Sequence, residues 1–154
     1  MGFLIIDGNS ILNRAFYGIR VLTNSRGVAT NAVTGFMNTL LMLEKDVDPD
    51  MIAVAFDLKA PPFRHMPEDL AQQLPYMKKI ITAMGITIIE KEGFEADDII
   101  GTVSAACADK KIPCTVSTGD RDSFQLVNDY VTVRLAKTKG DIYYTPMLLW
   151  RSTA

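Results

Sequence analysis

Short, continuously apolar runs alternate with amphipathic stretches along the whole chain. Five apolar runs predict strands, at residues 3–7, 51–57, 86–90, 113–118 and 131–135. They lack the polar–apolar alternation of a sheet with one wet face, so we expect both faces of the sheet to be buried. Between them, apolar residues recur at intervals of three and four, which predicts helices. Strands that alternate with helices indicate an α/β fold of three layers, with a mainly parallel central sheet covered by helices on both faces.

The helical periodicity also gives approximate boundaries. Helices are expected over residues 10–16, 30–47, 67–84, 95–111 and 123–126, and a short edge strand over 141–144. Pro75 should break or kink the third helix, because proline has no N–H to donate and its ring clashes with the preceding turn. Gly85 is well placed to end the same helix.

The composition describes a chain that folds around its own core. It has 154 residues, of which 48% are hydrophobic and 22% charged, as expected of one soluble globular domain. At this size folding buries roughly 68–70% of the unfolded surface. No stretch approaches the ~18 apolar residues of a membrane span. Asp7 interrupts the apolar N-terminus that a signal peptide would need, so we expect a cytoplasmic protein.

Cysteine and histidine leave few options for metal or nucleophilic chemistry. Cys107 and Cys114 lie in apolar stretches without metal-binding spacing, so we expect reduced core residues. His65 is the single histidine, which leaves little material for histidine-based catalysis. A bound metal would have to be held by carboxylates, which favours Mg²⁺ or Mn²⁺ over structural zinc.

Three acidic residues gather within four positions, at Glu95, Asp97 and Asp98, directly before an apolar run. A helix start explains this stretch taken alone, because the helix dipole favours acidic side chains in the first turn by ~0.3–1 kcal/mol each. A divalent-metal cluster is the second explanation, since hard cations take oxygen ligands. The choice depends on whether other carboxylates reach the same place.

Aspartates also close three other predicted strands. Asp7 follows the first strand, Asp57 the second, and Asp120 with Asp122 the fourth. Any one of them could be a helix cap or turn former, and the spacing of Asp122 to Gln125 resembles a capping box. In an open parallel sheet, however, the carboxyl ends of the strands share one edge, where ligands bind. Four strand ends that each deliver carboxylates to one edge predict a metal site.

A carboxylate-lined pair of cations roughly 3.5–4 Å apart suits in-line displacement at a phosphodiester. Such a site needs neither a histidine nor a covalent nucleophile from the protein. The Asp-x-Asp spacing of Asp120 and Asp122 places both side chains on one face only in extended backbone. In a turn they would diverge, with one binding directly and the other through water.

Several motifs, in order along the chain, resemble those of the 5′ nucleases of the flap endonuclease family, which includes the N-terminal 5′→3′ exonuclease domain of bacterial DNA polymerase I. The matching runs are Leu4–Ser10, Arg14–Tyr17, Thr30–Val33 with Gly35–Phe36, Ala53–Asp57, Phe63–His65, Glu95–Asp98 and Thr118–Asp122. They cover nearly the whole chain and are specific together, whereas Glu-Ala-Asp-Asp alone would not be.

The resemblance implies a PIN-like α/β fold and Mg²⁺-dependent (or Mn²⁺-dependent) hydrolysis of DNA at 5′ ends and 5′ flaps, with two ions. It implies that the catalytic and metal-binding acids are Asp7, Asp57, Glu95, Asp97, Asp98, Asp120 and Asp122. Arg14 matches a basic residue near the scissile phosphate, and Lys59 and Arg64 match the basic approach to the DNA.

The chain departs from the family pattern in two places. The family inserts a longer basic segment, the helical arch, where His65 here meets Met66 directly, so residues 1–154 are expected to form a single nuclease domain without an arch near 65–66. The family also continues into a helix–hairpin–helix region with two further metal-binding aspartates, which the 154 residues do not contain. We expect a polymerase domain in the parent chain, and feeble cleavage or none by these 154 residues alone.

The formal net charge of −2 is a weak argument against a nucleic-acid partner. Setting the seven candidate metal acids aside leaves eleven acidic residues against sixteen basic ones, a remainder of +5. With cations filling the site, the rest of the surface could attract phosphate.

Other function classes fit parts of the pattern. Receivers and haloacid-dehalogenase-like phosphatases share the fold class, but the phosphatase motif needs Asp-x-Asp where Asp7 is followed by Gly8 and Asn9. A receiver has no acidic triplet at a helix start. A non-catalytic DNA-binding or scaffold module that keeps the nuclease fold is the main alternative. A dinucleotide-binding fold is excluded because the first strand–helix turn lacks Gly-x-Gly-x-x-Gly.

Overall fold

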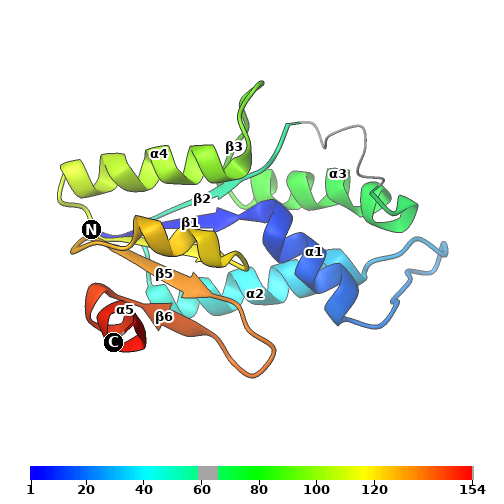
Figure 1. Cartoon of the computed structure of the whole chain (residues 1–154). Helices are drawn as coiled ribbons and strands as arrows, with labels where there is room; N and C mark the ends of the chain where they lie inside the picture. Colours follow the sequence, from blue (N-terminus) through cyan, green and yellow to red (C-terminus); the bar gives the residue numbers. More distant parts are fainter. Residues whose placement is uncertain (59–65, 154) are drawn as a thin grey trace.

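A computed structural model, which describes residues 1–58 and 66–153, shows a six-stranded sheet covered by helices on both faces (Figure 1). The strands are β1 (Phe3–Asp7), β2 (Met51–Ala55), β3 (Thr87–Ile89), β4 (Cys114–Thr118), β5 (Val131–Leu135) and β6 (Ile142–Tyr144). Their order is β3-β2-β1-β4-β5-β6; β1 to β5 are parallel and β6 is antiparallel to β5. The predicted fold class and the predicted edge strand are confirmed.

Two apolar cores lie on opposite faces of this sheet. The helices are α1 (Gly8–Gly18), α2 (Asn31–Val47), α3 (Glu68–Ala83), α4 (Ala96–Asp109) and α5 (Pro146–Thr153), with a 3₁₀ helix η1 (Arg121–Leu126). Leu4 and Ile6 of β1 point to the face covered by α1, α2 and α3. Ile5 points to the opposite face, which α4 covers. Because successive strand residues face opposite sides, one five-residue strand serves both cores.

The predicted start of the first helix and the predicted break at Pro75 are wrong. The first helix begins at Gly8 rather than Ser10, because the Asp7 side chain caps it by accepting a hydrogen bond from the backbone N–H of Ser10 at 3.0 Å. The third helix runs through Pro75 without a break. Pro75 and Ala71, whose carbonyl loses its partner to the proline, are both exposed, so water can bond that carbonyl.

The start of α2 is capped by a side chain from another helix. Gln73 of α3 is 1% exposed, and its Oε1 accepts hydrogen bonds from the backbone N–H groups of Ala32 at 2.8 Å and Val33 at 3.1 Å. Its Nε2 donates to Oδ1 of Asn31 at 3.1 Å. These bonds satisfy backbone donors that every helix start leaves without a partner, and they tie α3 to α2.

Smaller predictions are confirmed. Gly85 follows α3 with φ +77°, and the next residue, Ile86, donates its N–H to the Ile81 carbonyl at 3.2 Å, which closes the helix. Cys107 and Cys114 are buried free thiols, and burial raises the pKa of Cys114 to about 12. Within residues 1–58 and 66–153, the structure contains no helix with the length and apolar character needed to cross a bilayer.

Candidate metal centre

Asp7 is the buried member of the acidic site, with 5% of its surface exposed. It ends β1, and while one oxygen caps α1, the other accepts a hydrogen bond from Thr118 Oγ1 at 2.9 Å. The next residue must be glycine, because a Cβ at Gly8 would come within 2.5 Å of the Phe56 ring. Burial, followed by the charges of Asp97 and Asp57, raises the pKa of Asp7 to about 6.

Asp57 connects the end of β2 to the start of α4. Its backbone N–H donates to Oδ1 of Asn9 at 2.9 Å, and its own Oδ1 accepts from the backbone N–H of Ala96 at 2.6 Å. A carboxylate from a neighbouring strand therefore occupies the N-terminal end of α4, where the helix dipole favours negative charge.

The three acids at the start of α4 are all exposed. Asp98 accepts a hydrogen bond from the backbone N–H of Glu95 at 3.0 Å, so the helix-start explanation holds for this residue. Asp97 behaves differently, because burial and then repulsion raise its pKa. The repelling carboxylates, largest effect first, are Asp120, Asp57, Glu95 and Asp98. Asp97 therefore lies where acids from three segments converge.

Asp120 and Asp122 lie on the turn that leads from β4 into η1. Asp120 caps η1, since its Oδ1 accepts from the backbone N–H of Asp122 at 2.9 Å, while its own N–H donates to Thr118 Oγ1 at 3.1 Å. The N-cap of η1 is therefore Asp120, two residues before Asp122, whose spacing to Gln125 resembles a capping box. Asp120 is half-buried and Asp122 is exposed.

The structure brings most of the predicted site residues to one edge of the sheet. Mutual electrostatic effects link Asp7, Asp57, Glu95, Asp97, Asp98 and Asp120. Asp122 is next to this group along η1 but is not among the carboxylates that shift the pKa of Asp97 or Asp7. Arg14 is exposed on α1 and lines a pocket with Gly119 and Arg121. Lys59 and Arg64 lie outside the described residues.

The donor set fits a hard divalent cation held partly by water. Within the described ranges, no three acidic, cysteine or histidine side chains stand close enough together to hold an ion by themselves. Mg²⁺ usually keeps several waters and takes only one or two protein carboxylates, so it does not need such a trio. Burial, and after it the charges of neighbouring carboxylates, raise the pKa of Asp7 and of Asp97, and a bound cation would offset both effects.

Sequence reasoning missed the polar residues that hold these carboxylates in place. Thr118 bonds both Asp7 and Asp120, and Ser10 Oγ accepts the backbone N–H of Gly119 at 2.8 Å. A Cβ at Gly119 would approach Ser10 Oγ to 2.7 Å, so a side chain at this position would push the Ser10 hydroxyl out of its bond. The run from Asp7 to Ser10 signalled a turn, but nothing in it indicated its partner more than a hundred residues away.

Without divalent cations, Asp7 should make the folded chain less stable as the pH rises. Its folded pKa of about 6 lies above the ordinary 3.8, so the folded state holds the proton more tightly than the unfolded state. The stability that this proton supplies is complete below about pH 4 and is lost as the pH rises through about 6. At about 1.4 kcal/mol per pKa unit, the loss is roughly 3 kcal/mol.

Urea unfolding in a chelator, from pH 4.5 to 8, measures this loss for the parent chain and for Asp7→Asn. As the pH rises, the free energy of unfolding should fall by less for Asp7→Asn than for the parent. Asp129→Asn, at an exposed position, is the matched control and should follow the parent. Parallel curves for the parent and Asp7→Asn would contradict the assignment of the raised pKa.

Solved structures share this fold. The chain superposes with a TM-score of 0.68 and 17% identity on a bacteriophage T5 flap endonuclease described as a pseudo-enzyme-product complex with DNA and metal ions, covering 99% of this chain and 60% of that one. A zinc-bound T5 5′-exonuclease matches with a TM-score of 0.67 and 17% identity, over 92% of this chain and 58% of that one. At this identity the match identifies the PIN-like fold, as predicted.

Relatives found by sequence have a higher identity to this chain than these solved structures have. DNA polymerase I of Caldicellulosiruptor bescii is 40% identical over 153 residues, which is 92% of this chain and 18% of the relative. DNA polymerase I of Bacillus subtilis is 37% identical over 158 residues, again 18% of the relative. The chain thus spans about a fifth of the length of these curated relatives.

The family model described as "5′-3′ exonuclease, N-terminal resolvase-like domain" matches residues 2–148. This match gives no support to the alternatives, which were a receiver, a haloacid-dehalogenase-like phosphatase and a non-catalytic DNA-binding or scaffold module. The chain belongs to the family of 5′-3′ exonuclease N-terminal domains.

Proposed function

We propose that this chain hydrolyses DNA phosphodiesters at 5′ ends and 5′ flaps, with Mg²⁺ or Mn²⁺ bound at the acidic edge of the sheet. The observation that carries the proposal is the position of Asp97, where carboxylates from the ends of three separate segments act on one another. The T5 flap endonuclease with DNA and metal ions and the DNA polymerase I relatives support DNA as the substrate.

The residues proposed to hold two cations, directly or through water, are Asp7, Asp57, Glu95, Asp97, Asp98, Asp120 and Asp122. Two bound cations supply an activated water and compensate the charge that develops on the attacked phosphate. Asp7, held by Thr118 and by the start of α1, gives the site a buried carboxylate of fixed orientation. Arg14, which is exposed and lines a pocket with Gly119 and Arg121, is the residue proposed to contact a substrate phosphate.

The relatives support a wider setting for this domain. Because they are DNA polymerases of which the chain spans about a fifth, we propose a polymerase domain in the parent chain and a cytoplasmic location, where bacterial DNA is found. Residues 1–154 would form one nuclease domain, and the arch missing near 65–66 adjoins residues outside the described ranges. Lys59 and Arg64 remain proposed DNA contacts.

A cleavage assay tests the proposed function. The purified chain, in excess over a 5′-flap DNA labelled at either end, should release products from the 5′ side in Mg²⁺ or Mn²⁺ and none in a chelator. Cleavage should be slow, because the arch segment expected in the family is not found between His65 and Met66 of this sequence. Cleavage that continues in the chelator, or that starts from 3′ ends, would reject the proposed function. Fast cleavage in Mg²⁺ would reject only the expectation that the activity of this chain is impaired.

A further inference from the structure

The pocket that Arg14 lines with Gly119 and Arg121, beside the acidic site, is lined by positive charge. It encloses about 420 Å³, and its walls include four basic residues, Arg14, Arg121, Lys137 and Lys139. Leu135, Ala136, Gly119 and Thr138 complete the lining. No carboxylate among the described residues lines it. Four cations around one pocket repel one another, so a polyanion is the ligand that this charge arrangement favours.

The basic pocket and the acidic site share one turn of the chain. Asp120 acts on Asp97 in the acidic site, whereas its two neighbours, Gly119 and Arg121, line the basic pocket. The remaining walls come from α1 and from the loop after β5, which leaves the sheet at the same edge as Asp7 and Asp57. A DNA strand that passes the acidic site can therefore continue directly into the basic pocket.

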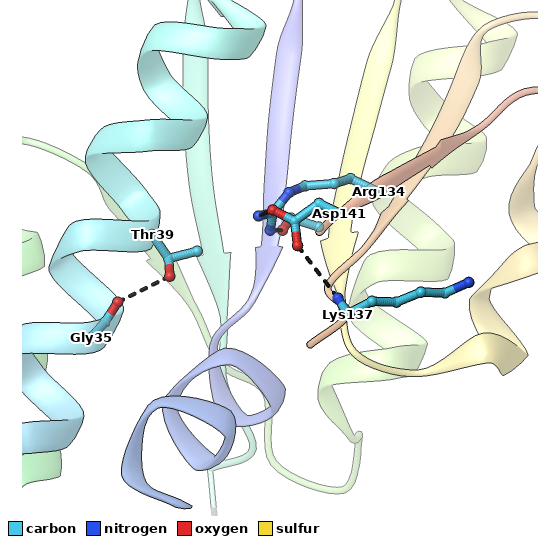
Figure 2. Close-up of polar contacts among 6 residues, drawn as sticks. Gly35, Thr39, Arg134, Lys137 and Asp141 are labelled. Carbon is cyan, nitrogen blue, oxygen red and sulfur yellow. Dashed lines mark hydrogen bonds and ion pairs between the residues drawn. The ribbon is translucent and has the colours of Figure 1, made fainter. Parts of the chain in front are cut away.

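The loop that carries the two lysines is held in place by an internal ion pair. Asp141 pairs with Arg134, which is 2% exposed, and also accepts the backbone N–H of Lys137 at 3.4 Å. Figure 2 shows the Lys137 side chain extending away from this pair. Its Nζ bonds Tyr144 Oη at 3.0 Å. Because Arg134 already neutralises Asp141, this carboxylate does not offset the positive charge of the pocket.

We propose that the basic pocket binds the phosphodiester backbone of the DNA strand next to the phosphate that is cleaved, with Arg121, Lys137 and Lys139 as contacts not previously assigned to the site. This inference rests on the proposed nuclease function, because it takes DNA as the substrate. The pocket sets the path of the strand past the acidic site, while the carboxylates perform the chemistry.

The salt dependence of DNA binding distinguishes contacts at the basic pocket from a general electrostatic attraction between the chain and DNA. The affinity of the chain for a 5′-flap DNA is measured by fluorescence anisotropy at several salt concentrations, with Ca²⁺ replacing Mg²⁺. Each lysine that contacts a phosphate contributes about 0.7–0.9 to the slope of log affinity against log salt. Lys137→Gln with Lys139→Gln should therefore reduce the slope by about 1.4–1.8 and weaken binding roughly 20- to 60-fold at 0.1 M salt.

Two further variants make the result specific. Lys45→Gln with Lys110→Gln removes the same charge from exposed positions near the opposite edge of the sheet, and should leave the slope unchanged. Lys139→Gln alone, at an exposed position, should reduce the slope by about 0.7–0.9 even if the contact of Lys137 with Tyr144 matters for folding. Thermal unfolding checks that each variant is folded.

Equal slopes for all variants, or an equal loss in the opposite-edge control, would overturn the proposal; so would a parent chain that does not bind the DNA. Cleavage is scored separately from binding. If the parent chain cleaves in Mg²⁺ but the pocket variants bind the DNA normally, the proposed DNA contact at the basic pocket is refuted and the nuclease function is supported. If the chain never cleaves but only the pocket variants lose affinity for the DNA, the cleavage proposed for these 154 residues is refuted and the DNA contact at the basic pocket is supported.

Discussion

Replacing Asp97 with Asn should lower metal-dependent cleavage of a 5′ flap by about a thousandfold, while the chain stays folded. The substitution keeps the shape of the side chain but removes the charge on which Asp120, Asp57, Glu95 and Asp98 act. Charge stabilisation by a bound metal is worth several kcal/mol in the transition state, and about 4 kcal/mol corresponds to a factor of a thousand in rate. Because Asp97 is exposed and repelled by its neighbours, its loss removes a source of repulsion in the folded chain.

The measurement is single-turnover cleavage with protein in excess, together with a titration of Mn²⁺ binding. Glu92→Gln is the matched control, an exposed acid three residues before Glu95 that is not among the carboxylates repelling Asp97. We expect it to cleave at the parent rate. Parent-like cleavage and metal binding by Asp97→Asn would reject the assignment of the metal site.

Replacing Asp141 with Ala should lower the free energy of unfolding by about 3 kcal/mol. Arg134 is buried between Ser117, whose Oγ accepts from Nη1 at 2.9 Å, and Asp141, which pairs with Nη2 (Figure 2). Its Nε has no hydrogen-bond partner within the described residues. Removing one partner of a buried ion pair typically costs about 3–5 kcal/mol, because it leaves an uncompensated charge. The low end applies because the Asp141 side chain is 25% exposed.

A second substitution tests this explanation. If the stranded guanidinium causes the loss, then adding Arg134→Met to Asp141→Ala should restore much of the stability, since an apolar side chain of similar length can occupy the same space. Urea unfolding at neutral pH measures both variants. A double variant no more stable than Asp141→Ala would show that the loss comes from the loop rather than from a buried charge.

The strand ends and their acids could be predicted because two local signals coincide. Each of the runs ending at Asp7 and Asp57 is apolar on both faces and then stops at a carboxylate. A parallel sheet necessarily brings such ends to one edge. The path of the chain in three dimensions was not needed to infer which acids would meet.

What could not be predicted depends on contacts between distant segments. The cap that Gln73 supplies to Ala32 spans 41 residues, and the bond from Thr118 to Asp7 spans 111. Arg134 is the one charged residue of β5, and only the loop after β5 explains how its charge is balanced. No periodicity records such pairings, because each partner by itself looks like an ordinary polar residue.

The capping bonds of the acidic site have a consequence for how it would meet a cation. One oxygen of each of four aspartates accepts a backbone N–H: Asp7 from Ser10, Asp57 from Ala96, Asp98 from Glu95, and Asp120 from Asp122. Folding therefore restricts the rotamers of these carboxylates, so the entropy cost of ordering them falls on folding instead of on binding. The same bonds make the orientation of the carboxylates depend on the first turns of α1, α4 and η1. Fraying at any of these starts would loosen the site even if no acidic residue were changed.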